Sequence, residues 1–119
     1  MVPSWDPAAF RELRTLEFRT VGAEEGEHWS TVWLVVLDGQ VYIRLGTRAA
    51  GRMQDNTTAP LVSVRVGGRQ YEHVRAEAMP AMAPQVAAAM GDKYAADLVV
   101  RHFSHPLTMR LVPAAAEQS

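Results

Sequence analysis

The sequence predicts a mainly β protein of the α+β class, with six antiparallel strands, a helix near the N-terminus and a helical segment before the last strand. Two short turns, Asp38-Gly39 and Gly67-Gly68, each join two apolar-rich segments, and such dipeptides favour tight hairpins. An Ala- and Met-rich stretch late in the chain is typical of a helix. With 119 residues, the chain is expected to form one domain over residues 1–119.

The first expected element is a short amphipathic helix. Asp6 can cap the first free N–H groups, and Pro7 suits the first helical position. Phe10, Leu13 and Leu16 then follow at helical spacing.

Three strands are expected next, over residues 18–21, 29–37 and 40–45. The second contains a continuous apolar run at residues 32–37. Such a run fits a strand that is buried on both faces, or a strand with one face in the core and the other at a subunit interface.

A glycine-rich polar connection, residues 46–58, is expected to contain one helical turn around residues 51–56. The remaining expected elements are strands at 61–66 and 69–78, a loop or helix start between Pro80 and Pro84, a helix at 85–100, a strand at 107–112 and a frayed tail at 114–119.

Composition excludes several classes of protein. The net charge is -1 with a pI near 6.4, whereas a general nucleic-acid or membrane-surface binder would be markedly basic. There are no cysteines, which rules out disulfides, thiolate catalysis and Cys-ligated metals. The N-terminus lacks a signal-peptide pattern and no apolar run could cross a bilayer, so we expect a cytoplasmic protein without a membrane partner.

Four side chains after the third strand are suited to holding a phosphate: Arg44, Thr47, Arg48 and Arg52. Guanidinium forks and hydroxyl groups are the donors that phosphate oxygens prefer. The spacing matches no P-loop and no dinucleotide fingerprint. The alternative is that these residues form an ordinary solvated loop.

Trp29 and Trp33 enclose Ser30 and Thr31 on the long apolar strand. A planar cofactor could lie against this strand, with backbone groups contacting its ring edge. The alternative is that both tryptophans belong to the core or to a dimer interface.

The four histidines do not form a metal-binding pattern: His28, His73, His102 and His105. No two of them have a metal-ligand spacing with a third group nearby, so we expect no metal site. One histidine could instead serve as an acid or a base, because its pKa lies near neutrality.

The segments STVWLVVLDG and QVYIRL, the basic loop ending at Arg52, and APLVSVRVGG follow one another in the order typical of a known family. Residues 18–78 resemble the pyridoxamine-phosphate-oxidase-like split β-barrel superfamily. The resemblance implies a six-stranded antiparallel split barrel, a homodimer with two cofactor sites at the subunit interface, and FMN or the deazaflavin F420 as cofactor. Other members bind haem or have lost redox function.

The resemblance also assigns roles to individual positions. It implies that the isoalloxazine ring is contacted by the backbone of four residues: Ser30, Thr31, Val32 and Trp33. Phosphate contacts fall to Arg44, Thr47, Arg48 and Arg52, and Gln70 approaches the ring from the partner chain. Substrate would enter over the ring near Trp29, His73 and Tyr94.

The function that these features predict is a small FMN- or F420-dependent oxidoreductase acting on a small organic substrate. Two alternatives remain open. One is a non-redox module that binds flavin, haem or a metabolite. The other is a cofactor-free pocket enzyme that uses His or Glu as acid and base, for which His73 and His102 are the histidine candidates.

Overall fold

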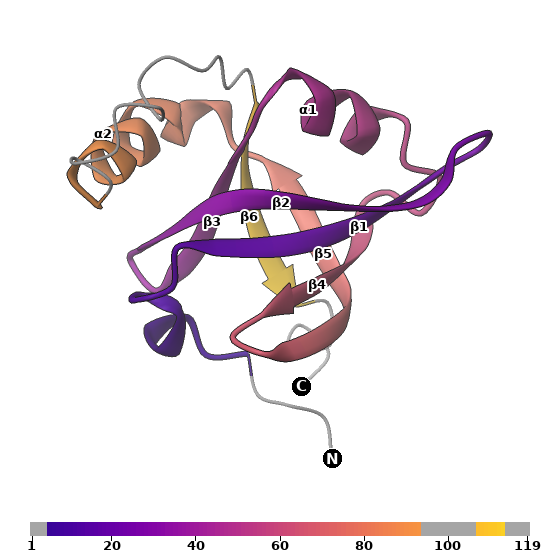
Figure 1. The fold of residues 1–119 in the computed structure, drawn as a ribbon. Helices are drawn as coiled ribbons and strands as arrows, with labels where there is room; N and C mark the ends of the chain where they lie inside the picture. Colours follow the sequence, from indigo (N-terminus) through magenta and orange to yellow (C-terminus); the bar gives the residue numbers. More distant parts are fainter. Residues whose placement is uncertain (1–4, 94–106, 114–119) are drawn as a thin grey trace.

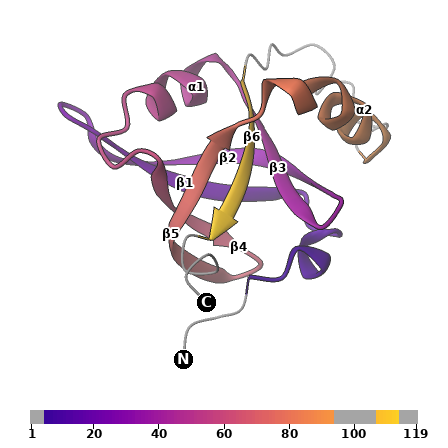
Figure 2. The same cartoon turned by 180° about the vertical axis from the view of Figure 1, so that it is seen from behind.

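The computed structural model of the chain describes residues 5–93 and 107–113. Six antiparallel strands close into a barrel in the order β1-β2-β3-β6-β5-β4 (Figure 1 and Figure 2). The strands are β1 (Thr15–Gly22), β2 (Gly26–Leu37), β3 (Gln40–Leu45), β4 (Leu61–Val66), β5 (Arg69–Ala78) and β6 (Leu107–Pro113). The helices are η1 (Pro7–Phe10), α1 (Thr47–Gln54), η2 (Pro80–Met82) and α2 (Ala83–Lys93), where η marks a 3-10 helix. The predicted mainly β architecture is confirmed.

Both predicted hairpin turns are present. Asp38 and Gly39 have φ angles of 51° and 72°, and Gly67 and Gly68 have φ angles of 62° and 77°. Left-handed geometry at both central positions matches the twist of the strands on either side. The two dipeptides therefore set the β2–β3 and β4–β5 hairpins.

The predicted N-terminal helix is confirmed as η1, but its predicted extension to Leu16 is wrong. The structure has only the four-residue η1, and the Asp6 side chain makes no capping hydrogen bond. Leu16 belongs to β1, which begins three residues before the predicted position 18. Leu16 and Phe18 are 2% and 0% exposed, because alternate residues of β1 face the barrel interior. The alternation of buried and exposed residues along β1 shows that Leu16 follows the spacing of a strand, although its spacing from Phe10 would also fit a helix.

The predicted polar connection after β3 is also corrected, since most of it forms α1. Met53 is buried in the core, and Ala49 and Ala50 pack against the same cluster. In Figure 1, α1 lies across the upper end of the barrel. Burial of this apolar side stabilises a helix whose sequence is otherwise polar.

Both faces of the apolar run in β2 are covered by this chain. Leu34 points into the barrel core, whereas Val35 packs outside the barrel against Val86 and Met90 of α2. Of the two predicted explanations, burial on both faces therefore accounts for this segment. The predicted continuation of the helix to residue 100 and the tail at 114–119 lie outside the described residues. No helix within the described ranges is long and apolar enough to span a membrane.

Asn56 joins the end of α1 to two strands. Its side chain is buried, with 6% exposure. Asn56 Oδ1 accepts hydrogen bonds from the N–H groups of Val21, at 3.0 Å, and Thr58, at 3.2 Å, while Nδ2 donates to the carbonyl of Leu61 at 3.2 Å. The amide thereby provides hydrogen-bond partners for one backbone N–H of β1 and one backbone C=O of β4.

We expect Asn56→Ala to lower the free energy of unfolding by about 2–4 kcal/mol, because buried backbone groups lose their partners. Urea unfolding measures the change. The matched control is Gln54→Ala, at an exposed position two residues earlier, which should change stability by no more than about 0.5 kcal/mol. Equal denaturation midpoints for the two variants would contradict this role of Asn56.

Candidate functional site

The barrel splits where β2 and β3 separate. Leu34 and Ile43 form the last pair between the two strands, so Trp33 and Arg44 are the first residues beyond it. Residues 26–33 of β2 continue in register with β1 alone, and the end of β3 pairs with β6. Among the described residues, one backbone edge of β2 therefore has no strand partner (Figure 1).

The four ring-contacting residues predicted on β2 all lie along this edge. Ser30 and Val32 face the barrel interior, Thr31 is exposed on the outside, and Trp33 packs against the α2 cluster. Ser30 Oγ is buried and has no hydrogen-bond partner among the described residues. Because a buried hydroxyl without a partner is costly, Ser30 retains hydrogen-bonding capacity at the split.

Three of the predicted phosphate-binding residues lie on the other side of the split. Arg44 is half-buried on β3, and burial lowers the pKa of its guanidinium. Thr47 and Arg48 are exposed in the first turn of α1, where Gly46 provides no side-chain cap and no acidic residue is present. The positive end of a helix disfavours a cation and favours an anion. The start of α1 is therefore electrostatically suited to binding an anion.

Arg52, in the last turn of α1, has a different environment. Its Nε lies 2.8 Å from Oε1 of Glu25, in the turn between β1 and β2, and holds the pKa of that carboxyl below its usual range. A cavity of about 460 Å³ beside this pair is also lined by Glu24 and Asp55. Arg52 is thus compensated by protein carboxylates, and its contact with a phosphate stays a prediction.

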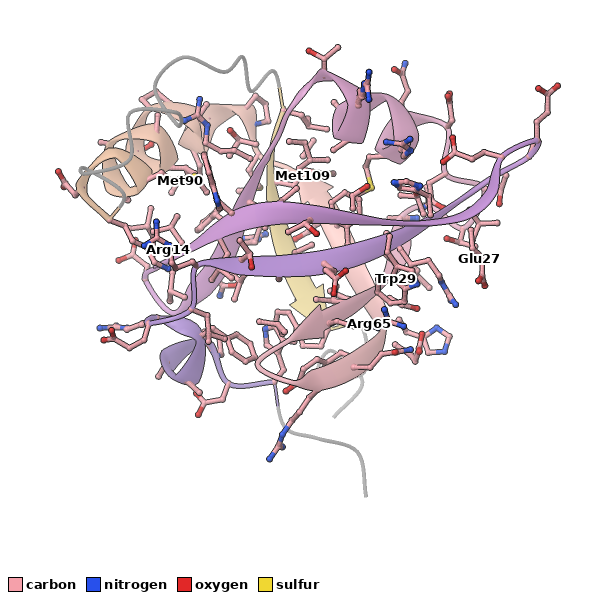
Figure 3. The ribbon with its side chains drawn as sticks, viewed as in Figure 1. Arg14, Glu27, Trp29, Arg65, Met90 and Met109 are labelled. Carbon is pink, nitrogen blue, oxygen red and sulfur yellow. The ribbon has the colours of Figure 1, made fainter. Side chains whose placement is uncertain are left out.

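The remaining predicted site residues lie on the outer face of the barrel. The guanidinium carbon of Arg65 lies 3.8 Å from the centroid of the Trp29 ring (Figure 3). Gln70 accepts a hydrogen bond from Arg65 Nε, at 3.2 Å. His73 is exposed on β5 with a φ angle of 56°, beside a register shift between β4 and β5. Tyr94 lies outside the described residues.

The structure does not bring Gln70 and His73 to the split of their own chain. They are on β5, which β4 and β1 separate from β2 and β6 separates from β3 in the barrel order. The prediction that Gln70 contacts the ring therefore requires a second copy of the chain. No group of three or more His, Asp or Glu side chains in the described ranges could hold a metal ion.

Sequence reasoning overlooked Arg65. The alternation of residues 61–66 places it on the outer face, but its contact with Trp29 crosses β1 to a strand far away in the sequence. The sequence pattern could place Arg65 and Trp29 on the outer faces of their strands. It could not predict that the two side chains are in contact.

The chain resembles several solved structures in fold. No protein-family model and no curated protein matches the sequence. The haem storage protein HutZ from Vibrio cholerae matches with a TM-score of 0.63 and 19% identity over 89% of this chain and 86% of that chain. The F420-H2 dependent reductase FDR-A matches with a TM-score of 0.59 and 14% identity over 83% and 94% of the two chains.

A third similar structure is the conserved hypothetical protein Rv2991 from Mycobacterium tuberculosis, with a TM-score of 0.61 and 18% identity over 90% of this chain and 78% of that chain. Identities this low establish the fold alone. The closed six-stranded barrel and these similarities together show that the chain has the split β-barrel fold that its sequence predicts.

Proposed function

We propose that the chain is a small oxidoreductase that binds FMN or F420 at the split between β2 and β3. The observation that carries the proposal is the position of Arg44 just beyond the last β2–β3 pair, with Arg48 following in a first turn of α1 that has no side-chain cap. The fold similarity to an F420-H2 dependent reductase supports the same class of cofactor.

Each part of the site has a defined task in this proposal. Arg44, Thr47 and Arg48 bind the cofactor phosphate through guanidinium, hydroxyl and helix N-terminal N–H donors. The backbone edge at residues 30–33 orients the ring by hydrogen bonds to its polar rim. The bound cofactor supplies the hydride chemistry. Trp33 and the apolar cluster beneath α2 exclude water from one side of the site.

We further propose that the working unit is a homodimer. One similar structure, with a TM-score of 0.60 and 14% identity, is described as a domain-swapped dimer. Gln70 lies on a strand remote from its own split, so a role at the ring depends on the second chain. Trp29, His73 and Tyr94 remain the proposed lining of the substrate pocket.

A non-redox ligand-binding module is the second candidate, because HutZ, on the same fold, is described as a haem storage protein. In that case the split would hold flavin or haem without turnover. The two candidates differ in whether the bound ligand exchanges electrons, and one set of measurements separates them.

We expect the purified protein to bind FMN or F420 with sub-micromolar affinity, as followed by visible absorption during titration. NAD(P)H should then reduce the bound flavin, or an acceptor should oxidise bound reduced F420. Sedimentation followed at the cofactor band should give twice the chain mass of 13.1 kDa. A Soret band with haem and no redox turnover would favour the ligand-binding module. A folded protein that binds none of these ligands would refute both candidates.

We expect Arg48→Ala to weaken FMN binding by about 10- to 100-fold, because a charge-assisted hydrogen bond to phosphate is lost. Riboflavin has the same ring without the phosphate, so its affinity should not change in this variant. Arg11→Ala, at an exposed arginine after η1, serves as the charge-matched control. Equal losses for FMN and riboflavin would mean that Arg48 does not contact the phosphate.

We expect Glu25→Gln to strengthen FMN binding severalfold, because the variant removes the carboxylate that competes with phosphate for Arg52. Glu24→Gln is the matched control, since Glu24 lines the same cavity and changes the charge equally. A gain confined to Glu25→Gln assigns Arg52 to the phosphate site. If FMN affinity does not rise, or rises equally in both variants, Arg52 does not contact the phosphate and only joins α1 to the β1–β2 turn.

A further inference from the structure

We propose a second anion site on the outer face of the barrel, built around Arg65, that binds the oxyanion of a small ligand. The group recognised is a carboxylate or a phosphate. The site lies between β1 and the β4–β5 hairpin. Its arginines differ from those proposed to bind the cofactor phosphate, although Trp29 and Gln70 also belong to the proposed substrate pocket and ring contact.

The Arg65 side chain is oriented by two contacts. It extends from β4 across β1 and stacks on the Trp29 ring of β2 at 3.8 Å from the ring centroid (Figure 3). Its Nε donates to Gln70 Oε1 at 3.2 Å. A stacked guanidinium with its Nε engaged keeps its terminal N–H groups available in a fixed plane. The arrangement reduces the ordering that a ligand would otherwise have to impose on this side chain.

Two carboxylates lie near Arg65, namely Glu17 opposite it on β1 and Glu72 on β5, and neither forms an ion pair with it. Glu72 accepts hydrogen bonds from Ser63, which is 3% exposed, and from Gln70 Nε2 at 2.6 Å. These contacts hold the pKa of the Glu72 carboxyl below its usual range. Within the described part of the chain, no carboxylate lies at ion-pair distance from Arg65.

Arg19 provides an internal comparison. Its guanidinium also lies near Trp29, at 6.0 Å from the ring centroid. Unlike Arg65, it is paired with Glu27 at 3.2 Å and with Glu72 at 3.8 Å. Of these two arginines beside one tryptophan, Arg19 has carboxylate partners and Arg65 has no ion pair among the described residues, so Arg65 is the one better placed to bind an anion.

Arg65 also lines a cavity of about 430 Å³. Arg69, Gln70 and Thr15 contribute further donors to its wall, and Glu17 is its one carboxylate. Arg69 is exposed and has no ion-pair partner among the described residues. Two guanidinium groups against one carboxylate make the cavity attractive to an oxyanion, and its volume suits a small ligand.

The test is an NMR titration of the full chain with inorganic phosphate and, separately, with succinate at constant ionic strength. We expect saturable shifts of the amides of residues 65–70 and of the Trp29 indole N–H. Arg65→Gln and Arg69→Gln should each weaken the affinity by about tenfold, the size of one charge-assisted hydrogen bond. Arg11→Gln should leave the affinity unchanged and controls for the loss of a charge.

Each outcome has a defined meaning. Saturation by both probes assigns a general oxyanion site, and saturation by one probe identifies the group that is recognised. Shifts that stay linear with concentration, or that persist equally in Arg65→Gln and Arg69→Gln, would overturn the proposal. Arg69 has an exposed side chain, so its variant tests the site even if replacing Arg65 disturbs the hairpin. Shifts at residues 46–48 report the separate phosphate site, so either site can fail independently.

Discussion

The long strand β2 changes partners partway along its length, and the arrangement of the molecule follows from this change. Its first eight residues pair with β1 and its last four pair with β3. Where β3 departs, the chain turns into α1 across the end of the barrel, and Arg44 lies next to a backbone edge that no described strand pairs with. A barrel with continuous β2–β3 pairing would offer no such edge. The proposed cofactor site is thus a direct consequence of strand pairing.

Two arginines on α1, one helical turn apart, are in opposite electrostatic situations. Arg52 lies at the C-terminal end, where the helix dipole favours a cation, and it has Glu25 as its partner. Arg48 lies at the N-terminal end, where the dipole opposes a cation and no acidic residue shares the turn. The protein alone accounts for the position of Arg52, whereas the position of Arg48 is favourable once an anion is present. This contrast is the strongest argument for a ligand at the start of α1.

The sequence predicted the features that local interactions determine. The turn at Asp38-Gly39 needs left-handed geometry, which these residue types supply, so the hairpin was predictable without knowledge of the rest of the chain. Leu16 was assigned to a helix because its spacing from Phe10 fits one, and only pairing with β2 makes it part of a strand. Met53 stabilises α1 by contact with the barrel core, which no local pattern reveals. The stack of Arg65 on Trp29 was equally hidden, since it joins β2 to β4 across an intervening strand.

A net charge of -1 argues against an extended electropositive surface. The net charge does not determine where the individual charges lie in the folded chain. In the folded chain, Glu24, Glu25 and Asp55 gather around the tip of the β1–β2 hairpin and the end of α1. Among the described residues, Arg65 and Arg69 line the outer cavity between β1 and the β4–β5 hairpin without an ion pair, and Arg48 lies in the first turn of α1, which has no side-chain cap. Interactions between exposed charges are largely screened beyond about 8–10 Å at physiological salt. Each cationic spot therefore acts on a small ligand through its immediate neighbours, and a nearly neutral protein can present separate sites for anions.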